Sequence, residues 1–563
     1  MKQLITDNLA IWTTAPKGIK KLRELILELA VRGLLVPQDP TDEPASELLK
    51  KIAAEKARLV SEGKIKSPKP LAKISEEEKP FDLPMGWEWA RLGDVTNYGA
   101  CDKAESTDVD EQTWVLELED VEKETSRLIK KVRFVEKQFK SSKNRFLAGD
   151  VIYGKLRPYL DKVLVADEAG VCTTEMIPIR GYSSIVPEFL RLTLKSSYFI
   201  NYADNSTHGM SLPRMGTEKA QLALIPILSE PEQQRIVAKV DELMQLCDRL
   251  EQKQNGSQAM HRQLVSCLLT TLTEATDAQA FQAAWSRIAA NFDCLFTTEH
   301  SIEQLKQTIL QLAVMGKLVP QNPTDEPASE LLKKIATEKA RLITEGKIKK
   351  QNPLPKISEQ EKPFVLPNGW EWTHMINCAK QITDGEHLTP QRTLDFTQIP
   401  LVTAKNVRDG AMDYTNTDYV DLDVATKCWN RCKPEPNNIL IVSVGATIGR
   451  LTIIDDHRDM VIVRSVTLVK PLSINIPYLA LSLRSPYMQK SIWRGVKQNA
   501  QPCLYLSVSN SLLIPLPPFA EQHRIVTKVD ELMTLCEQLK TKLATTQTLQ
   551  QQLADTLVQQ AVA

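Results

Sequence analysis

The sequence predicts an α+β protein in which one large module occurs twice, with two mixed α/β domains separated by long helices. Three observations support this fold class. Two phrases recur in the chain, the recurring phrases carry helical heptad spacing, and the segments between them contain β-branched runs broken by glycine. A chain of 563 residues is also too long for one hydrophobic core, so several domains are expected.

The duplication can be seen directly in the sequence. The phrase PTDEPASELLKKI occurs at Pro40–Ile52 and, letter for letter, at Pro323–Ile335. A second phrase occurs as EQQRIVAKVDELMQLC from Glu232 and as EQHRIVTKVDELMTLC from Glu521. A repeat this long excludes a solenoid of short repeats and indicates two copies of one module. The flanks of the two copies are similar, whereas their middles differ. The two sets of flanks are therefore expected to have the same function, and the two middles to have related but different functions.

The flanking phrases predict long helices that pair as coiled coils. Apolar residues step by four and three, as at the a and d positions of a coiled-coil seam. The N- and C-terminal helices are expected to repeat the central arrangement, with antiparallel coiled-coil helices closing a pseudo-twofold ring. The predicted coiled-coil or partner interface consists of Ile236, Val240, Leu243, Cys247 and Leu250 in the first copy and Ile525, Val529, Leu532, Cys536 and Leu539 in the second.

The middles predict strands and turns. The runs GDVIYGKLRPYLDKVLVAD and NILIVSVGATIGRLTIID are apolar, β-branched and broken by glycine, and they occupy comparable places in the two copies. Each is followed by a helical stretch and by an apolar strand that contains proline. The expected domains are an N-terminal helical region, a first mixed domain, a central helical region, a second mixed domain and a C-terminal helix, at 1–79, 80–230, 231–360, 361–518 and 519–563.

Composition and motifs exclude several classes of function. Seventy basic residues balance 70 acidic ones, which disfavours a protein coated in nucleic acid but leaves a local basic groove possible. The chain has no phosphate-binding loop, dinucleotide fingerprint or nucleophile elbow. In LPPF, Leu516 stands where an amino-methyltransferase has Asn or Asp. The lone CWNRC spacing is a weak metal signal, so no catalytic and no metal-binding residue is assigned.

Without an apolar run of about 18 residues or a signal peptide, a cytoplasmic protein is expected, with no membrane partner.

Several segments resemble one family. The run IPLPPFAEQHRIVTKVDELMTLCEQL is similar to the characteristic helical segment of the specificity (S) subunit of type I restriction–modification systems, and IPILSEPEQQRIVAKVDELMQLCDRL is the same element. LPMGWEWARLGDV and LPNGWEWTHM resemble the start of that family's target recognition domains. GATIGR, DGEHLTP and LVTAKNV resemble phrases within them, although the first domain has GKLRPYL in place of SVGATIG and lacks DGxHxTP. The resemblance covers essentially the whole chain.

The resemblance implies a non-catalytic reader of double-stranded DNA. Two target recognition domains would each bind one half of a bipartite, asymmetric sequence, and the helices would dock two methyltransferase (M) subunits. No cofactor would bind this chain, because S-adenosylmethionine belongs to the M subunits, and ATP with Mg²⁺ to the restriction (R) subunits. Half-sites one helical turn apart lie about 34 Å from each other, so a helical spacer suits such a target.

Specific reading requires donors and acceptors on loops that reach base edges. The interpretation that competes with DNA contact at each position is a plain turn, or an arginine that is solvated or ion-paired. The DNA-contact candidates are Lys155, Arg157, His208, Ser211 and Arg214 in the first domain, and His387, Thr389, Lys405, Asn406, Arg408, Arg450, Arg494, Lys497 and Gln498 in the second.

Two other functions stay open at this point. The first is a fused or type IIB-like restriction–modification recognition subunit. A fused methyltransferase–specificity enzyme would need a cofactor loop and an Asn- or Asp-led Pro-Pro-aromatic site, and neither is present. A coiled-coil adaptor without a DNA role would not require Gly-rich loops that bear Arg and Lys in both middles.

Overall fold

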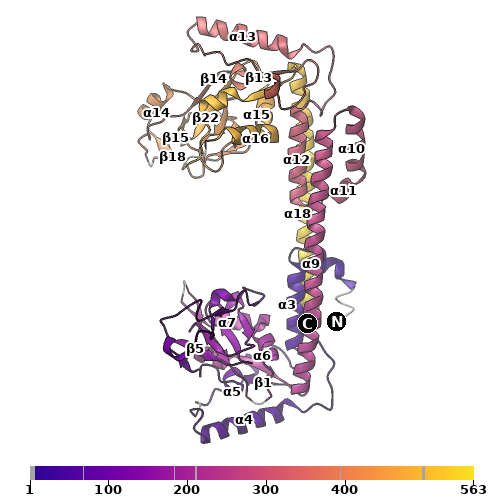
Figure 1. The fold of residues 1–563 in the computed structure, drawn as a ribbon, viewed down its shortest axis with the longest axis vertical. Coiled ribbons are helices and arrows are strands. Elements are labelled where there is room, and N and C mark those ends of the chain that lie inside the picture. Colours follow the sequence, from indigo (N-terminus) through magenta and orange to yellow (C-terminus); the bar gives the residue numbers. More distant parts are fainter. Residues whose placement is uncertain are drawn as a thin grey trace. The chain divides into compact units, whose positions relative to one another are not determined.

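The chain folds into two compact units joined by two long helices (Figure 1). The first unit contains Met1–Gln258 with Thr546–Ala563, and the second contains Ala259–Thr545. Helices α9 (Glu230–Glu274) and α18 (Phe519–Val562) each begin in one unit and end in the other. The predicted tandem duplication of mixed domains linked by long helices is confirmed. The computed structural model describes residues 7–67, 69–182, 184–209, 212–393, 395–497 and 501–562.

The first unit combines helices with a mixed domain. A five-stranded sheet of order β2-β5-β8-β3-β4 lies beside a three-stranded sheet of order β7-β6-β9, and β1 pairs antiparallel with β12. Its helices, besides the start of α9, are α2 (Leu9–Thr14), α3 (Gly18–Val31), α4 (Ala45–Ser61), α5 (Leu92–Val95), α6 (Pro187–Leu194), α7 (Ser197–Asn205) and α8 (Thr217–Leu222). Its strands are β1 (Glu88–Arg91), β2 (Lys103–Ala104), β3 (Trp114–Leu116), β4 (Val132–Arg133), β5 (Lys143–Phe146), β6 (Val151–Gly154), β7 (Val163–Val165), β8 (Gly170–Cys172), β9 (Met176–Ile179), β10 (Thr207–His208), β11 (Arg214–Met215) and β12 (Leu224–Ile227).

The second unit repeats this plan with a different strand arrangement. A four-stranded sheet of order β14-β22-β19-β20 lies beside a three-stranded sheet of order β18-β15-β21, and β13 pairs antiparallel with β23. Its helices are α10 (Ala278–Ala290), α11 (Phe292–Leu295), α12 (Glu299–Val314), α13 (Ala328–Thr344), α14 (Leu422–Trp429), α15 (Ile476–Arg484), α16 (Pro486–Gly495) and α17 (Leu506–Ser511). Its strands are β13 (Glu371–His374), β14 (Ala379–Asp384), β15 (Ile399–Val402), β16 (Val407–Arg408), β17 (Ala411–Met412), β18 (Asp418–Val420), β19 (Ile439–Val442), β20 (Leu451–Ile453), β21 (Val461–Ile462), β22 (Val466–Pro471) and β23 (Leu513–Leu516).

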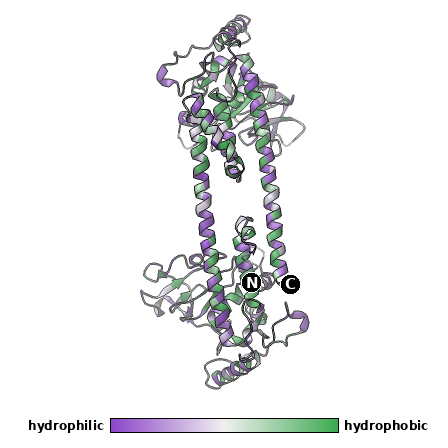
Figure 2. Ribbon diagram, turned by 90° about the vertical axis from the view of Figure 1, so that its right-hand side faces the viewer, coloured by the Kyte–Doolittle hydropathy of each residue, from purple (hydrophilic) through white to green (hydrophobic). Residues whose placement is uncertain are grey.

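The long helices bury their apolar seams inside the chain. In the first unit, Ile236 of α9 shares a core with Leu22 of α3 and with Ala554 near the end of α18. In the second unit, Ile525 of α18 shares a core with Ile302 of α12. Hydrophobic and hydrophilic residues alternate along the helix that ends at C (Figure 2). Each fully buried Ile or Leu contributes about 1.5–3 kcal/mol, so these seams fix the helices within their units.

A buried hydrogen bond fastens each mixed domain to its long helix. The indole Nε1 of Trp87 donates to Glu232 Oε2 on α9 at 3.0 Å, and that of Trp370 donates to Glu521 Oε2 on α18, also at 3.0 Å. Both tryptophans come from the GWEW phrase and both glutamates from the EQ phrase. We call these two contacts the Trp–Glu latches. Their repetition explains why the two phrases are duplicated together.

The phrase PTDEPASELLKKI takes part in the same junctions. Arg235, three residues after the latch glutamate, pairs with Asp42 of this phrase at 2.5 Å, and Arg524 pairs with Asp325 at 2.6 Å. The helix that begins within each phrase, α4 or α13, buries an Ala, a Leu and an Ile and leaves its other side chains exposed or half-buried. The phrase therefore joins the start of a long helix to a short helix whose outer face is open.

A second side chain of the EQ phrase secures the mixed domain. Gln233 Oε1 accepts from the N–H of Val186, next to α6, at 2.8 Å. Gln522 Oε1 accepts from the N–H of Asn475, next to α15, at 2.9 Å. Gln233 and Gln522 are both buried, so each amide holds the start of a domain helix against the long helix.

Among the described residues, no helix has the length and apolarity that crossing a membrane requires.

The latch carboxyls make stability depend on pH. Burial raises the pKa of Glu232 and of Glu521, although the hydrogen bonds that they accept act in the opposite direction. A carboxyl whose folded pKa is raised stabilises the fold below its unfolded pKa, and this contribution is lost as pH rises through the folded value. The double variant Glu232→Gln, Glu521→Gln keeps an acceptor for each indole and has no proton to lose. We expect its urea midpoint to fall less than that of the wild type between pH 4.5 and pH 8.

The matched variant Glu232→Ala leaves the Trp87 N–H buried without its acceptor. It should lower the free energy of unfolding by about 1–3 kcal/mol at pH 4.5, and by less at higher pH, where the wild type has itself lost part of the contribution of the Glu232 carboxyl. Equal pH dependence in the wild type and in the Gln variant would show that the latch carboxyls do not titrate in this range.

Candidate nucleic-acid interface

In the second unit, the loops at the ends of β19 and β22 meet the loops predicted to bind DNA. The N–H of Ser443, directly after β19, donates to Ser465 O, directly before β22, at 2.9 Å. The N–H of Glu386 in DGEHLTP donates to Ile462 O at 2.9 Å, and the N–H of Arg464 donates to Glu386 O at 3.0 Å. Backbone hydrogen bonds thus hold the DGEHLTP loop against the β21–β22 turn.

Two further predicted loops join this place. The N–H of Ala404, in LVTAKN, donates to Ser465 Oγ at 3.3 Å. The segment after α16 forms an antiparallel bridge between Lys497 and Cys503, and the N–H of Leu504 donates to Ser443 O at 2.8 Å. Three predicted loops that are far apart in the sequence therefore converge beside Ser443 and Ser465. We call this group the second loop cluster.

The first unit contains an equivalent first loop cluster. The N–H of Lys155, directly after β6, donates to Glu175 O at 3.0 Å, and the N–H of Met215 donates to Lys155 O at 3.0 Å. The N–H of Arg157 donates to Pro213 O at 2.8 Å. Strands β10 and β11 pair His208 with Arg214 in the same hairpin. The predicted loops 154–157 and 208–214 are therefore in contact.

The two clusters have the same pattern of backbone hydrogen bonds, so each residue of one cluster can be matched with a residue of the other; we call this matching the shared register. Each bond in the first cluster has a counterpart in the second, including the N–H of Gly445 donating to Pro502 O at 3.0 Å and the bridge between Val444 and Cys503. The register aligns side chains of different chemistry on the same backbone positions. In order, Lys155, Arg157, Glu175, His208 and Arg214 correspond to Ser443, Gly445, Ser465, Lys497 and Cys503.

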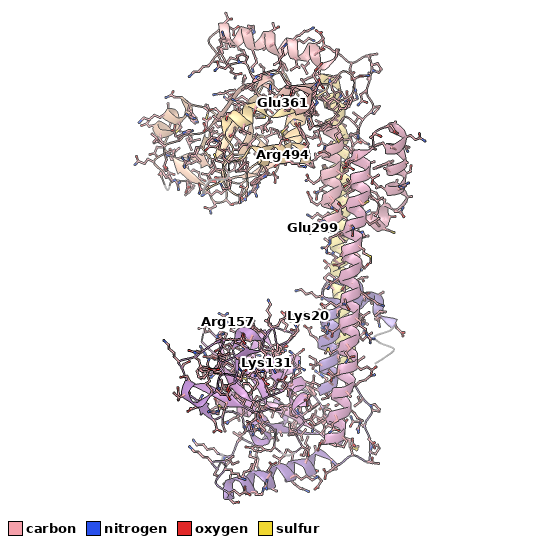
Figure 3. The ribbon with its side chains drawn as sticks, in the orientation of Figure 1. Lys20, Lys131, Arg157, Glu299, Glu361 and Arg494 are labelled. Atoms are coloured by element: carbon pink, nitrogen blue, oxygen red, sulfur yellow. The ribbon has the colours of Figure 1, made fainter. Side chains whose placement is uncertain are left out.

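The structure divides the candidates of the second domain into open, paired and buried groups. Thr389 and Arg494 are exposed, and Arg450 is half-buried. None of these three side chains has a hydrogen bond or ion pair within the described ranges. Arg494 lies at the end of α16 (Figure 3). Lys497 lies 5.3 Å from the ring centroid of Tyr505. Gln498 lies outside the described residues.

Other candidates of the second domain are ion-paired. Lys405 contacts Asp418 at 3.4 Å, and Arg408 contacts Asp413 at 3.0 Å. Hydrogen bonds from Thr415, with Arg408 close by, lower the pKa of Asp413 to about 2, so this carboxylate stays charged at neutral pH. His387 Nε2 lies 2.6 Å from Asp384 Oδ2. These side chains must exchange an acidic partner for DNA if they bind it.

Asn406 is a correction to the sequence-based assignment, because its side chain is buried. Its Oδ1 accepts from Thr403 N at 2.9 Å and Thr403 Oγ1 at 3.1 Å. Its Nδ2 donates to Asp413 O at 3.0 Å and Thr417 Oγ1 at 2.9 Å. All four of its bonds stay within the chain, so Asn406 shapes its loop and has no donor left for a base.

The first domain places its candidates as follows. The side chain of Lys155 has no hydrogen bond or ion pair within the described ranges, and Arg214 is paired with Glu175. Arg157 (Figure 3) has a left-handed backbone with φ 52°, at the position where the second cluster has Gly445 with φ 95°. His208 belongs to β10, and Ser211 lies outside the described residues.

Three charged residues of these clusters were not predicted from the sequence. Arg464 is exposed in the β21–β22 turn, with no ion pair within the described ranges. Arg431, after α14, donates through Nε to Asp384 O at 3.1 Å and pairs with the Asp384 carboxylate. Glu175 precedes β9 and binds Arg214. The one available signal for Arg464 was a single arginine inside the apolar run MVIVRSVTLV.

The predicted seam residues are occupied within the chain. In the first copy, Ile236, Val240, Leu243 and Cys247 are buried in the core that α9 forms with α3. In the second copy, Ile525, Val529 and Cys536 are buried in the core with α12. Leu250, Leu532 and Leu539 pack partly buried against the same cores. These side chains therefore lie in helical seams within the chain, which is the coiled-coil alternative of the assignment.

Comparisons with known proteins identify one family for the whole chain. The family described as Type I restriction modification DNA specificity domain matches residues 403–546. The chain is 38% identical to the Type I restriction enzyme EcoAI specificity subunit of Escherichia coli and 37% identical to the EcoEI specificity subunit of that organism, with full coverage of both chains in each comparison. A structure titled "Structural basis underlying complex assembly and conformational transition of the type I R-M system" has the same fold, with a TM-score of 0.50 and 19% identity over 86% of this chain and 99% of that one.

Two mixed domains on long helices, each with a cluster of polar loops, define a recognition subunit. The chain belongs to the family of type I restriction enzyme specificity subunits. Such subunits recognise DNA and leave catalysis to partner subunits, so this chain is a non-catalytic component of a restriction–modification system.

Replacing Asn406 should affect stability before it affects specificity. We expect Asn406→Ala to lower the free energy of unfolding by about 2 kcal/mol, because the half-buried groups of Thr403, Asp413 and Thr417 lose their partners. Lys405→Ala, its exposed neighbour, should change it by less than about 1 kcal/mol. Urea denaturation of the full chain measures both. An Asn406→Ala chain of wild-type stability would return Asn406 to the list of DNA-contact candidates.

The backbone of Arg157 provides a second prediction. A non-glycine residue with this φ is strained by about 1 kcal/mol, so Arg157→Gly relieves that strain while it removes the contacts of the side chain, and we expect it to weaken DNA binding. The matched control is Gly445→Ala in the second cluster. A Cβ added there would have no atom within 4 Å, so the change in stability of this variant measures the backbone strain alone. We expect Gly445→Ala to lower the stability. An Arg157→Gly chain that binds DNA like the wild type would exclude a role for this side chain.

Proposed function

We propose that the chain reads a bipartite, asymmetric sequence in double-stranded DNA, with one loop cluster for each half. The observation that carries this proposal is the shared register. Two clusters with the same backbone hydrogen bonds present different side chains at corresponding positions. Backbone hydrogen bonds set the geometry, whereas side-chain donors and acceptors distinguish base pairs. One scaffold with two sets of side chains is what two different half-sites require.

We further propose that two M subunits dock on equivalent surfaces of the two units, and that R subunits join this assembly. The exposed faces of α4 and α13 support two identical contacts. Lys50 pairs with Glu47 at 2.6 Å, and Lys333 pairs with Glu330 at 2.7 Å. The ion pair of Lys51 with Glu43 is likewise repeated by Lys334 with Glu326. Folding does not require identity at exposed positions, so this repetition favours two copies of one partner.

The chemistry in this scheme belongs to the partners. S-adenosylmethionine would bind to the M subunits, which modify adenine, and ATP with Mg²⁺ would bind to the R subunits. The chain itself would position the DNA. Its two units would present one half-site each, so that both M subunits act on a single target.

A domain graft tests this function. Replacing residues 371–516 with residues 88–227 connects matching strand ends, because Glu88 pairs with Ile227 as Glu371 pairs with Leu516. The grafted chain would carry two copies of the first cluster, so we expect its target to consist of one half-site and its inverted copy. Methylome sequencing of cells that express the graft and the M subunit reads out that target.

The wild-type chain, expressed with the same M subunit, is the control and should give an asymmetric bipartite target. An unchanged methylated sequence after the graft would contradict the assignment of one half-site to each cluster. No specific methylation or DNA retention with either chain would favour the adaptor without a DNA role.

A further inference from the structure

One acidic residue lies within the otherwise basic first loop cluster. The neighbours of Glu175 in the shared register are Lys155, Arg157, His208 and Arg214. A carboxylate at this place repels the phosphates that the basic side chains would attract, so phosphate binding cannot account for it. Its contacts indicate another role.

Glu175 holds one edge of the Arg214 guanidinium. Arg214 Nε donates to Glu175 Oε1 at 3.1 Å and Oε2 at 3.0 Å, and Arg214 Nη1 donates to Leu212 O at 3.3 Å. The Nη2 group and one N–H of Nη1 take no part in these bonds. Arg214 is 43% exposed and Glu175 is 27% exposed, so the remaining donors can be reached from solvent.

The scaffold itself does not need this ion pair. In the second cluster the corresponding positions are Ser465 and Cys503, neither of which is charged. The backbone bond between the two strand ends is nevertheless formed, at 2.9 Å there and at 3.0 Å in the first cluster. The hairpin bridge is also formed, between Lys497 and Cys503 as between His208 and Arg214. The same loops therefore close without the Arg–Glu pair.

We propose that Glu175 is a positioning residue that holds Arg214 so that its terminal amino groups reach acceptors on one base edge in the first half-site. The donor pattern fits guanine, whose O6 and N7 accept two N–H groups from arginine. A carboxylate that binds Nε removes the rotamer freedom of the long side chain before DNA arrives, which strengthens discrimination between base pairs. This inference rests on the proposed function and adds the residues that specify one base pair.

The test uses the full-length chain in complex with its M subunit. The variants are Glu175→Ser, Arg214→Cys, the double variant, and Glu175→Asp as the conservative replacement. Ser and Cys are the residues of the second cluster at these positions, so the variants are expected to fold. Binding at fixed salt is measured to the methylated target sequence, to duplexes with each base pair of the first half-site changed, and to a random duplex.

We expect Glu175→Ser and Arg214→Cys to lose discrimination at the same base pair, by roughly 10-fold or more. The double variant should be no worse than Arg214→Cys alone, because Glu175 acts through Arg214. Glu175→Asp should recover part of the loss. Arg214→Cys should weaken binding to the random duplex far less than it weakens discrimination.

Three results would overturn the inference. Unchanged discrimination in Glu175→Ser would show that Arg214 needs no positioning. Loss at a different base pair from Arg214→Cys would show that Glu175 reads a base directly. An equal loss on every duplex together with a lower melting temperature would show a structural role. If the wild-type complex binds all duplexes alike, the proposed function itself fails, and that outcome is distinct from the other three.

Discussion

The Trp–Glu latch is the contact on which each unit depends. Each mixed domain returns to its long helix through one antiparallel strand pair, and the latch lies where that pair meets the helix, with the indole of Trp87 or Trp370 bound to a buried carboxyl. A buried donor without its acceptor costs about 1–3 kcal/mol, so neither partner can change alone. This constraint accounts for the GWEW and EQ phrases together, whereas the domain between them remains free to diverge.

Within that frame, backbone hydrogen bonds set the geometry of each loop cluster and side chains set its chemistry. The bonds from Lys155 and Ser443 to the facing strand end hardly differ, although one side chain is a long cation and the other a small hydroxyl. Arg157 shows the limit of this freedom. It occupies a left-handed position that Gly445 fills without strain, and such strain persists where a side chain has a use.

The sequence was sufficient to predict the features that depend on local pattern. Heptad spacing predicted α9 and α18, and glycine-broken β-branched runs predicted the strands that carry the loops. It did not reveal that Asn406 is buried, because an amide in a polar loop looks the same whether its partners are water or Thr403 and Asp413. It also could not pair Glu175 with Arg214, since that contact depends on how β9 and the β10–β11 hairpin meet in space.

The ion pairs in the loop clusters also bear on the neutral charge of the chain. Asp418 and Asp413 each hold a cation of the second cluster, and Glu175 holds Arg214 in the first. The carboxylate beside each of these cations cancels most of its charge, so the attraction between the cation and a phosphate is reduced. Under the proposed function, only a target that offers base-edge acceptors in the right places compensates for the loss of these partners. Self-pairing of this kind would then lower affinity for random DNA more than affinity for the target, and specificity is the difference between the two.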